Sequence, residues 1–106
     1  CPPCINEMPT IDKLKNHFKG NDELIFLMVD IDNQIEASTA FMKEYGYDLP
    51  VYTVQGEIPT SYLGNAIPTT VLLDKSGEIF MRLEGGRDYF SKEMIEIIDE
   101  MLKNKV

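Results

Sequence analysis

Two different patterns of apolar residues follow each other in the first third of the chain. From Ile5 to Phe18, apolar residues recur at steps of three or four, which predicts one face of a helix that ends at Gly20. Residues 24–29 form a short apolar run without charges, and such a run predicts a strand buried on both faces, as in parallel sheets. A helix is therefore expected to lead into a buried strand.

The rest of the chain predicts a second helix, further strands and a closing helix. Asn33 and Glu36 have the spacing of a capping box, so the second helix is expected to begin there. Its apolar face would carry Ala37, Phe41 and Tyr45. Strands are predicted at residues 50–54, 69–73 and 79–83, with a helical turn at residues 59–63 and a hairpin turn at residues 74–77.

The last predicted helix carries its apolar face from Phe90 to Leu102, with Ser91 as its cap. Strands that alternate with helices and then close in a hairpin indicate an α/β fold with a mixed sheet. The chain has 106 residues and contains no repeats or low-complexity segments, so we expect a single domain over residues 1–106.

Charge narrows the classes of partner. With 10 Lys and Arg against 18 Asp and Glu, the net charge is −8. We expect no nucleic-acid partner, because phosphate binding needs a basic surface, and no docking on anionic lipid. The longest apolar run is far too short to cross a membrane, and no signal peptide is recognised.

The chemistry of the sequence is concentrated in Cys1-Pro2-Pro3-Cys4, at the start of the first predicted helix. Two cysteines three positions apart on a helix lie on one side, one turn apart, where their sulfurs can close a disulfide. The positive end of the helix stabilises a thiolate, which is the reactive form of cysteine. We predict that Cys1 attacks a substrate disulfide and that Cys4 resolves the mixed disulfide.

Two other interpretations of the cysteines are open. They could be inert core residues, although a core position does not need two prolines at a helix start. They could be half of a metal site, but His17 lies about 20 Å further along the same helix, so other ligands would have to come from another molecule.

Two further positions carry candidate chemistry. Glu7 lies one turn beyond Cys4, and a partly buried carboxylate there would have a raised pKa and could exchange protons with the Cys4 thiol. By spacing alone, a solvated helix glutamate is the stronger interpretation. The Ile67–Pro68 bond precedes a buried strand, and spacing alone favours the trans form, because only about one X–Pro bond in twenty is cis.

Several short motifs are distributed over essentially the whole chain. They are CPPC at residues 1–4, Glu7-Met8-Pro9, Ile67-Pro68-Thr69-Thr70 ahead of residues 71–74, and Ser76-Gly77. With these motifs the chain resembles the TlpA/ResA-like thiol–disulfide oxidoreductases of the thioredoxin superfamily. The resemblance implies a thioredoxin-like three-layer fold, in which helices flank a mixed central sheet.

The resemblance also implies roles for individual residues. Pro68 would be a cis-proline beside the CxxC pair, and the Ile67 backbone would be free to pair with a substrate strand. Glu7 occupies the position of the family's helix glutamate near the cysteines. Tyr62, Ala66 and Ile67 are expected, from their nearness to Pro68, to form an apolar rim where a partner docks.

The implied chemistry needs no cofactor beyond a redox-active Cys1–Cys4 disulfide. Its partners would be disulfide-containing proteins, among them apocytochromes c, and an electron-donating protein. Members of the family are mostly periplasmic or otherwise extracytoplasmic, and many are tethered to a membrane. Many act as reductants, so we expect a reductase more than an oxidase.

The resemblance implies one element that residues 1–106 do not contain. In this fold a central strand comes immediately before the CxxC motif, and without it the strands at residues 24–29 and 69–73 each lose a neighbour. We therefore expect a domain truncated before CxxC, with an upstream segment of the same protein needed to complete the sheet. The alternative function is a non-catalytic thioredoxin-like binding module, or a protein that holds Cu(I) between two thiolates.

Overall fold

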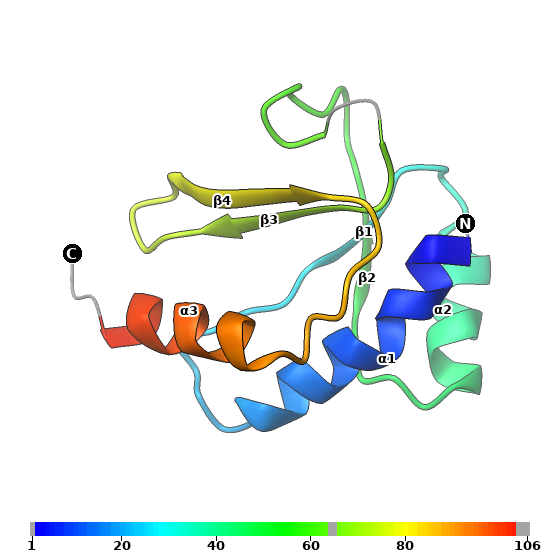
Figure 1. Ribbon diagram of the computed structural model, residues 1–106. Helices are drawn as coiled ribbons and strands as arrows, with labels where there is room; N and C mark the ends of the chain where they lie inside the picture. The colour runs from blue at the N-terminus through cyan, green and yellow to red at the C-terminus, as the bar shows by residue number, and fades with distance from the viewer. Residues whose placement is uncertain (1, 64–65, 104–106) are drawn as a thin grey trace.

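The structure, a computed structural model, describes residues 2–63 and 66–103. The helices are α1 (Pro2–His17), α2 (Ile35–Glu44) and α3 (Lys92–Lys103), and the strands are β1 (Met28–Asp30), β2 (Val51–Thr53), β3 (Thr69–Leu73) and β4 (Ile79–Glu84). Their order confirms the predicted α/β class (Figure 1). No helix within the described residues combines the length and the apolar character that crossing a bilayer requires.

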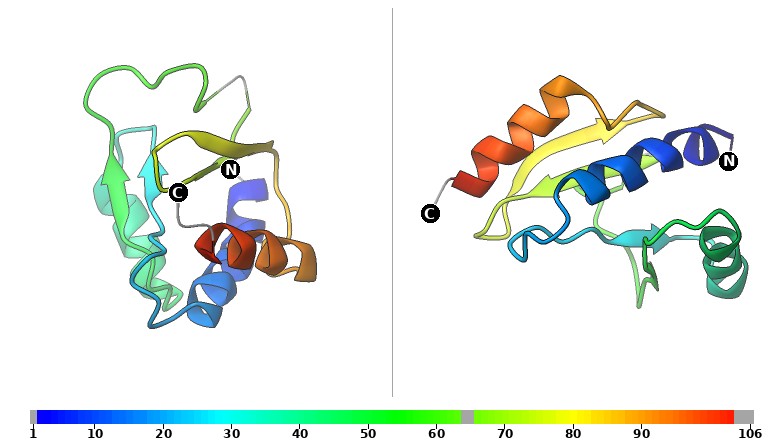
Figure 2. Two further views of the ribbon diagram at one scale, coloured as in Figure 1. Left: turned by 90° about the vertical axis from the view of Figure 1, so that its left-hand side faces the viewer. Right: turned by 90° about the horizontal axis from the view of Figure 1, so that it is seen from below.

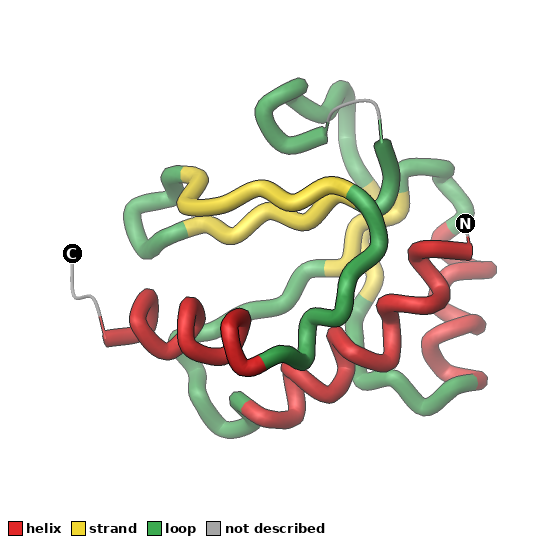
Figure 3. Tube along the Cα trace, in the orientation of Figure 1, coloured by secondary structure: helices red, strands yellow, loops and turns green. Residues whose placement is uncertain are grey.

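The strands form two separate pairs. β1 and β2 run parallel, with Met28 opposite Val51, and β3 and β4 run antiparallel, with Thr69 opposite Glu84. Figure 3 shows the two pairs in yellow, joined by a long loop. In the described part of the chain, the predicted mixed sheet is therefore present as two two-stranded sheets, one of each kind.

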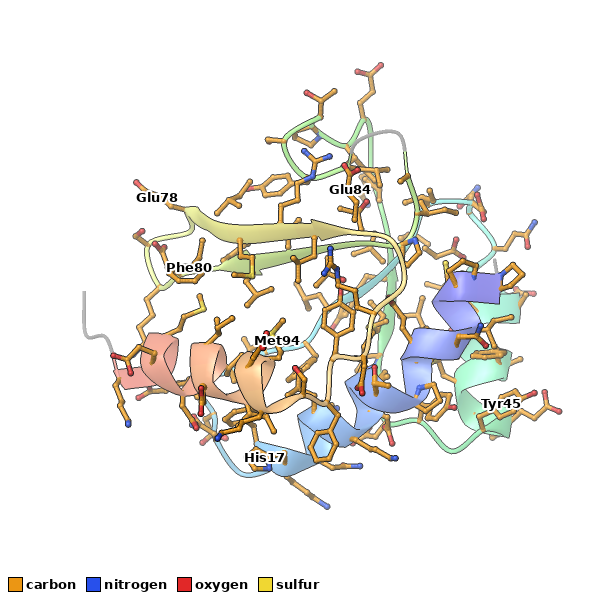
Figure 4. All side chains as sticks on the ribbon, in the orientation of Figure 1. His17, Tyr45, Glu78, Phe80, Glu84 and Met94 are labelled. Atoms are coloured by element: carbon orange, nitrogen blue, oxygen red, sulfur yellow. The ribbon has the colours of Figure 1, made fainter. Side chains whose placement is uncertain are left out.

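The core lies between the helices and both strand pairs. Its buried apolar residues are Ile11, Leu14, Met42, Leu49, Tyr89, Met94 and Ile98. Helices α1 and α3 lie on the same side of the β3–β4 hairpin, as Figures 1 and 2 show from different directions. Figure 4 shows Met94 pointing from α3 toward that hairpin, so α3 closes the core through the apolar face that its sequence predicts.

The prediction of a strand over residues 24–29 that is buried on both faces is wrong. β1 begins only at Met28, while Ile25 and Leu27 are 75% and 60% exposed. Alternate residues, such as Phe26 and Met28, pack against the core. The opposite face is open because nothing among the described residues covers it.

The predicted capping box of the second helix is also wrong. Asn33 adopts φ 56°, and the N-cap is Gln34, whose side chain makes no capping hydrogen bond. Instead, the Asp30 carboxylate accepts hydrogen bonds from the Gln34 N–H and the Ser38 hydroxyl, both at 3.0 Å. Met42 is the buried residue of α2, whereas Tyr45 of the predicted apolar face is 58% exposed and points outward in Figure 4.

Predictions for the second half of the chain hold more closely. β3 has the predicted bounds, and the hairpin turn places Gly77 at φ 89°, a conformation that favours glycine. The Ser91 hydroxyl accepts a hydrogen bond from the Met94 N–H at 3.1 Å, which confirms the cap of α3. Phe90 lies before this helix and is exposed, so the buried face begins at Met94.

Candidate active site

The CPPC motif lies at the N-terminal end of α1. Pro2 and Pro3 belong to the first turn, where the missing proline N–H costs nothing because that group would have no partner inside the helix. Cys4 is half-buried in this turn and is disulfide-bonded. Cys1, the predicted nucleophile, lies outside the described residues. The described part of the motif therefore presents a cysteine in the oxidised state at the positive end of a helix.

The turn at Pro68 and the CPPC helix meet adjacent residues, Gly85 and Gly86 respectively. The Ile67–Pro68 peptide bond is cis, and the Pro68 carbonyl accepts a hydrogen bond from the Gly85 N–H at 2.9 Å. At the next residue, Gly86, an added Cβ would lie 3.1 Å from the Cβ of Pro3. Because consecutive Cα atoms are only about 3.8 Å apart, Pro68 and the CPPC turn are brought close together.

Glu7 is buried beneath this motif, with only 5% of its surface exposed. Its Oε2 accepts a hydrogen bond from the Arg87 N–H at 3.3 Å. Burial raises the pKa of the Glu7 carboxyl, and the Arg87 N–H opposes this only in part. The interpretation of Glu7 as a solvated helix glutamate is therefore wrong. A buried carboxyl one turn from Cys4 can hold a proton at a higher pH than an ordinary glutamate can.

Two further residues near Glu7, Thr10 and Tyr89, are not among those predicted from the sequence. The Thr10 hydroxyl donates to the Glu7 carbonyl at 2.6 Å and accepts from the Tyr89 N–H at 3.0 Å. Tyr89 is 3% exposed, and burial raises the pKa of its phenol. Thr10 could have been found from its position one turn after Glu7, but nothing in the sequence near Tyr89 indicates contact with α1.

The predicted docking rim lies on the loop between β2 and β3. Ile67 is 45% exposed and directly precedes Pro68, while Ala66 is half-buried and its carbonyl accepts from the Thr69 hydroxyl at 2.6 Å. Tyr62 is 36% exposed and lies in a helical turn that begins at Pro59. The structure thus places Ile67 and Ala66 beside Pro68, and places Tyr62 earlier on the same loop.

An open groove of about 250 Å³ runs beside Cys4, between α1 and α2. Its walls are mostly apolar and include Ile5 and Met8 from α1 and Phe41 and Met42 from α2. No cluster of three or more His, Cys, Asp or Glu side chains able to hold a metal occurs in residues 2–63 and 66–103. The groups of the described site that can take part in chemistry include the sulfur of Cys4 and the buried carboxyl of Glu7.

Comparison with known protein families identifies the family to which the chain belongs. Residues 1–91 match the family described as Redoxin. The chain belongs to the Redoxin family. Among curated proteins, this Redoxin-family chain is similar to thiol-disulfide oxidoreductase ResA from Halalkalibacterium halodurans, with 30% identity over 97% of the chain and 57% of that protein. It is also similar to ResA from Bacillus thuringiensis subsp. konkukian, with 32% identity over 91% of the chain and 54% of that protein.

Solved structures show the thioredoxin-like fold. A thioredoxin candidate from Neisseria meningitidis aligns with TM-score 0.77 and 31% identity, over 99% of this chain and 69% of that one. StoA from Bacillus subtilis aligns with TM-score 0.71 and 24% identity, over 97% of this chain and 75% of that one. The chain spans about half the length of the curated relatives that it matches.

Proposed function

We propose that this chain carries the active site of a thiol–disulfide oxidoreductase that exchanges a CPPC dithiol or disulfide with protein substrates. The observation that supports this most directly is the disulfide-bonded Cys4 in the first turn of α1. Its neighbour Pro3 lies against Gly86, and the adjacent Gly85 donates a hydrogen bond to the Pro68 carbonyl. A redox-active sulfur at a helix N-terminus is suited to exchange because the helix stabilises the thiolate form.

In the proposed reaction, the Cys1 thiolate attacks one sulfur of a substrate disulfide. A mixed disulfide forms, and the first substrate sulfur leaves as a thiolate that takes up a proton. The Cys4 thiolate then attacks the Cys1 sulfur, which releases the second substrate sulfur and closes the Cys1–Cys4 disulfide. The protein dithiol is oxidised by two electrons and the substrate disulfide is reduced by the same two. The direction, reduction of the substrate, rests on the resemblance to the TlpA/ResA-like proteins.

Glu7 would serve the second step. The Cys4 thiol must lose its proton before it can attack, and a residue three positions further along a helix lies on the same side. Because burial raises the pKa of Glu7, its carboxylate is a better proton acceptor than an exposed glutamate would be. We assign Glu7 as the proton relay for Cys4.

Substrate proteins would dock beside Pro68. Ile67 is exposed immediately before this residue, and its backbone could pair with an extended substrate segment. Ala66 and Tyr62 would add apolar contact on the same loop. A substrate protein needs an exposed surface near the redox-active cysteine on which to dock.

The remaining expectations concern the whole protein. We propose that residues 1–106 form one domain, that an upstream segment supplies a strand between β1 and β3, and that a donor protein returns electrons to the Cys1–Cys4 pair. No cofactor beyond this pair is needed for the exchange. Extracytoplasmic location, with a role in reducing apocytochromes c, follows from the resemblance alone.

The test uses the full-length protein and its Cys1→Ser and Cys4→Ser variants. Wild type should reduce insulin disulfides with dithiothreitol as donor, and Cys1→Ser should lose this activity entirely. Cys4→Ser should keep the first step only, so it should accumulate a mixed disulfide with a substrate peptide, detectable by mass spectrometry. Retained activity in Cys1→Ser would refute the assigned nucleophile.

The same samples separate the proposal from its alternative. A binding module or copper protein would retain about one equivalent of Cu(I) per cysteine pair, through two thiolates, and would turn over no disulfide. Titration of the reduced protein with Cu(I), alongside the insulin assay, therefore distinguishes the two functions.

A further inference from the structure

The glycine pair Gly85-Gly86 resembles no phosphate-binding motif and is not explained by the proposed reaction. It opens the β4–α3 loop (residues 85–91), which connects the end of β4 to the start of α3. In Figure 1 this loop, in orange-yellow, passes beside α1. Its contacts link parts of the site that come from distant parts of the sequence.

The loop holds α1 and the Pro68 turn through its backbone. Its Gly85 N–H binds the Pro68 carbonyl at 2.9 Å. Two residues later the Arg87 N–H binds the Glu7 carboxylate at 3.3 Å, and the Tyr89 N–H binds the Thr10 hydroxyl at 3.0 Å. Because all three donors are backbone groups, these hydrogen bonds do not themselves depend on side-chain identity in the loop.

The loop comes close to α1 at Gly86. A Cβ there would lie 3.1 Å from the Cβ of Pro3 and 3.2 Å from the Pro3 carbonyl oxygen, both closer than ordinary van der Waals contact. The backbone of Gly86 is outside the left-handed region, whereas Gly85 has φ 87° and open space around it. A side chain at residue 86 would therefore press on Pro3 without straining its own backbone.

We propose that Gly86 is a positioning residue for the CPPC turn, and that its missing side chain lets Pro3 take the place it needs in the disulfide state. This inference rests on the proposed function. Pro3 lies between the two cysteines, so a Cys1–Cys4 disulfide closes a small ring that includes it. Opening that ring leaves Pro3 freer to move by the few tenths of an ångström that a Cβ at residue 86 would demand.

Gly86→Ala should therefore destabilise the oxidised form more than the reduced form. The measurement equilibrates the full-length protein with dithiothreitol, in a reaction that converts protein disulfide and reduced dithiothreitol into protein dithiol and oxidised dithiothreitol. We expect the equilibrium constant to rise by about threefold to tenfold toward the dithiol. This is a potential higher by about 14 to 30 mV, at about 29.6 mV for each tenfold change.

Gly77→Ala is the matched control. Gly77 has φ 89° with open space around it, so alanine there strains the β3–β4 turn without touching α1. It should lower stability and leave the equilibrium constant within about twofold of wild type. An unchanged or lower potential in Gly86→Ala, or an equal shift in Gly77→Ala, overturns the proposal.

A measurement on the wild-type protein covers the case in which Gly86→Ala does not fold. If the loop and the CPPC turn are coupled, the amides of Arg87 and Tyr89 should exchange hydrogen at least about threefold faster in the dithiol form than in the disulfide form. The Gly77 amide, which donates to the Asp74 carbonyl at 3.0 Å in the distant turn, should exchange equally in both. Equal rates for all three amides overturn the proposal.

The outcomes also separate this inference from the proposed function. A wild-type protein whose cysteine pair equilibrates with dithiothreitol but reduces no protein disulfide refutes the function, while the effect of Gly86→Ala on the equilibrium still decides the role of Gly86. A wild type that reduces insulin, with Gly86→Ala at an unchanged potential, refutes only the positioning role.

Discussion

The two strand pairs differ in what their outer faces expose. Along β4, the exposed Phe80, Arg82 and Glu84 alternate with the half-buried Met81 and Leu83. Arg82 and Glu84 form an ion pair on the exposed side, and Figure 4 shows Glu84 and Phe80 at opposite ends of the strand. This alternation is typical of a strand with one face in the core and one face in solvent.

The segment that contains β1 alternates in burial but not in polarity. The residues of its exposed row are Ile25, Leu27, Val29 and Ile31, with exposed fractions of 41% to 75%. A strand that is apolar on both faces is typical of a sheet covered on both sides. The exposed side of β4 thus carries an ion pair, although Leu73, Ile79 and Phe80 of the β3–β4 hairpin are also exposed. The exposed row that contains β1 is entirely apolar, and none of the described residues covers it.

The largest expected effect on stability comes from comparing two Ile→Ala substitutions, one in the core on α3 and one in the exposed row that contains β1. Both substitutions remove the same atoms. Ile98 of α3 is 6% exposed, so Ile98→Ala should lower the free energy of unfolding by about 2 to 5 kcal/mol through lost burial and a cavity. Ile25 is 75% exposed, so Ile25→Ala should change it by no more than about 0.5 kcal/mol. Urea denaturation of the full-length protein measures both.

The same two variants can also contradict the difference in burial described above. If Ile25→Ala costs more than about 1 kcal/mol, the apolar row is covered by protein outside the described residues, and the difference between the strand pairs disappears in the complete molecule. An Ile98→Ala cost within about 0.5 kcal/mol would show instead that α3 contributes little to the core.

A comparison of the N-caps of α3 and α2 is expected to give a smaller difference in the free energy of unfolding. Ser91 caps α3 with its own hydroxyl, so Ser91→Ala should cost about 1 kcal/mol, and Ser91→Asp should retain most of that stability. Gln34 is the N-cap of α2 without a side-chain bond, so Gln34→Ala should leave the free energy of unfolding within about 0.5 kcal/mol. Equal losses in thermal or urea melts would contradict the assigned caps.

These caps also show what the sequence can and cannot predict. The Ser91 cap and the Gly77 turn follow local rules, in which a hydroxyl or a glycine meets backbone within a few residues, and both were predicted correctly. The cap of α2 comes from Asp30, whose carboxylate reaches Gln34 only because β1 ends where it does. A capping box read from residues 33 and 36 could not include that dependence.

In the candidate site too, the sequence predicts the features that depend on neighbouring residues and does not predict those that depend on distant ones. The CPPC motif and its place at the start of a helix are local, and the sequence predicts them. The burial of Glu7 depends on the Arg87 N–H, 80 residues further along the chain, so spacing alone favoured a solvated carboxylate. For the Ile67–Pro68 bond, spacing favoured trans, and only the resemblance to a family implied the cis bond that the structure contains.

The raised pKa of Glu7 makes stability depend on pH. Because the folded state holds the Glu7 proton more tightly than the unfolded chain does, this group contributes most stability below its ordinary value of 4.5 and loses it as pH rises through the folded-state pKa. Glu7→Gln cannot titrate, so its stability relative to wild type should increase from about pH 4 to about pH 8.

Denaturation at several pH values, with the cysteines kept oxidised, measures this difference without a contribution from thiol titration. A constant or decreasing difference across the range would contradict the raised pKa. The expected trend would mark the α1 side of the molecule as one that gives up stability to keep a carboxyl buried beside Cys4.

The smallest expected effect belongs to an ion pair that links the two strand pairs. The Lys75 Nζ, in the β3–β4 turn, lies 3.0 Å from the Glu23 Oε2, ahead of β1, and also 3.3 Å from the Leu102 carbonyl. Both charged side chains are substantially exposed, at 35% and 62%, so water and salt screen their attraction. In a double-mutant cycle, Lys75→Ala and Glu23→Ala should couple by no more than about 0.5 kcal/mol, and less in high salt. A coupling above about 1 kcal/mol would mean that the turn holds the segment before β1 in place, and the two strand pairs would then be joined by charge as well as by their shared apolar core.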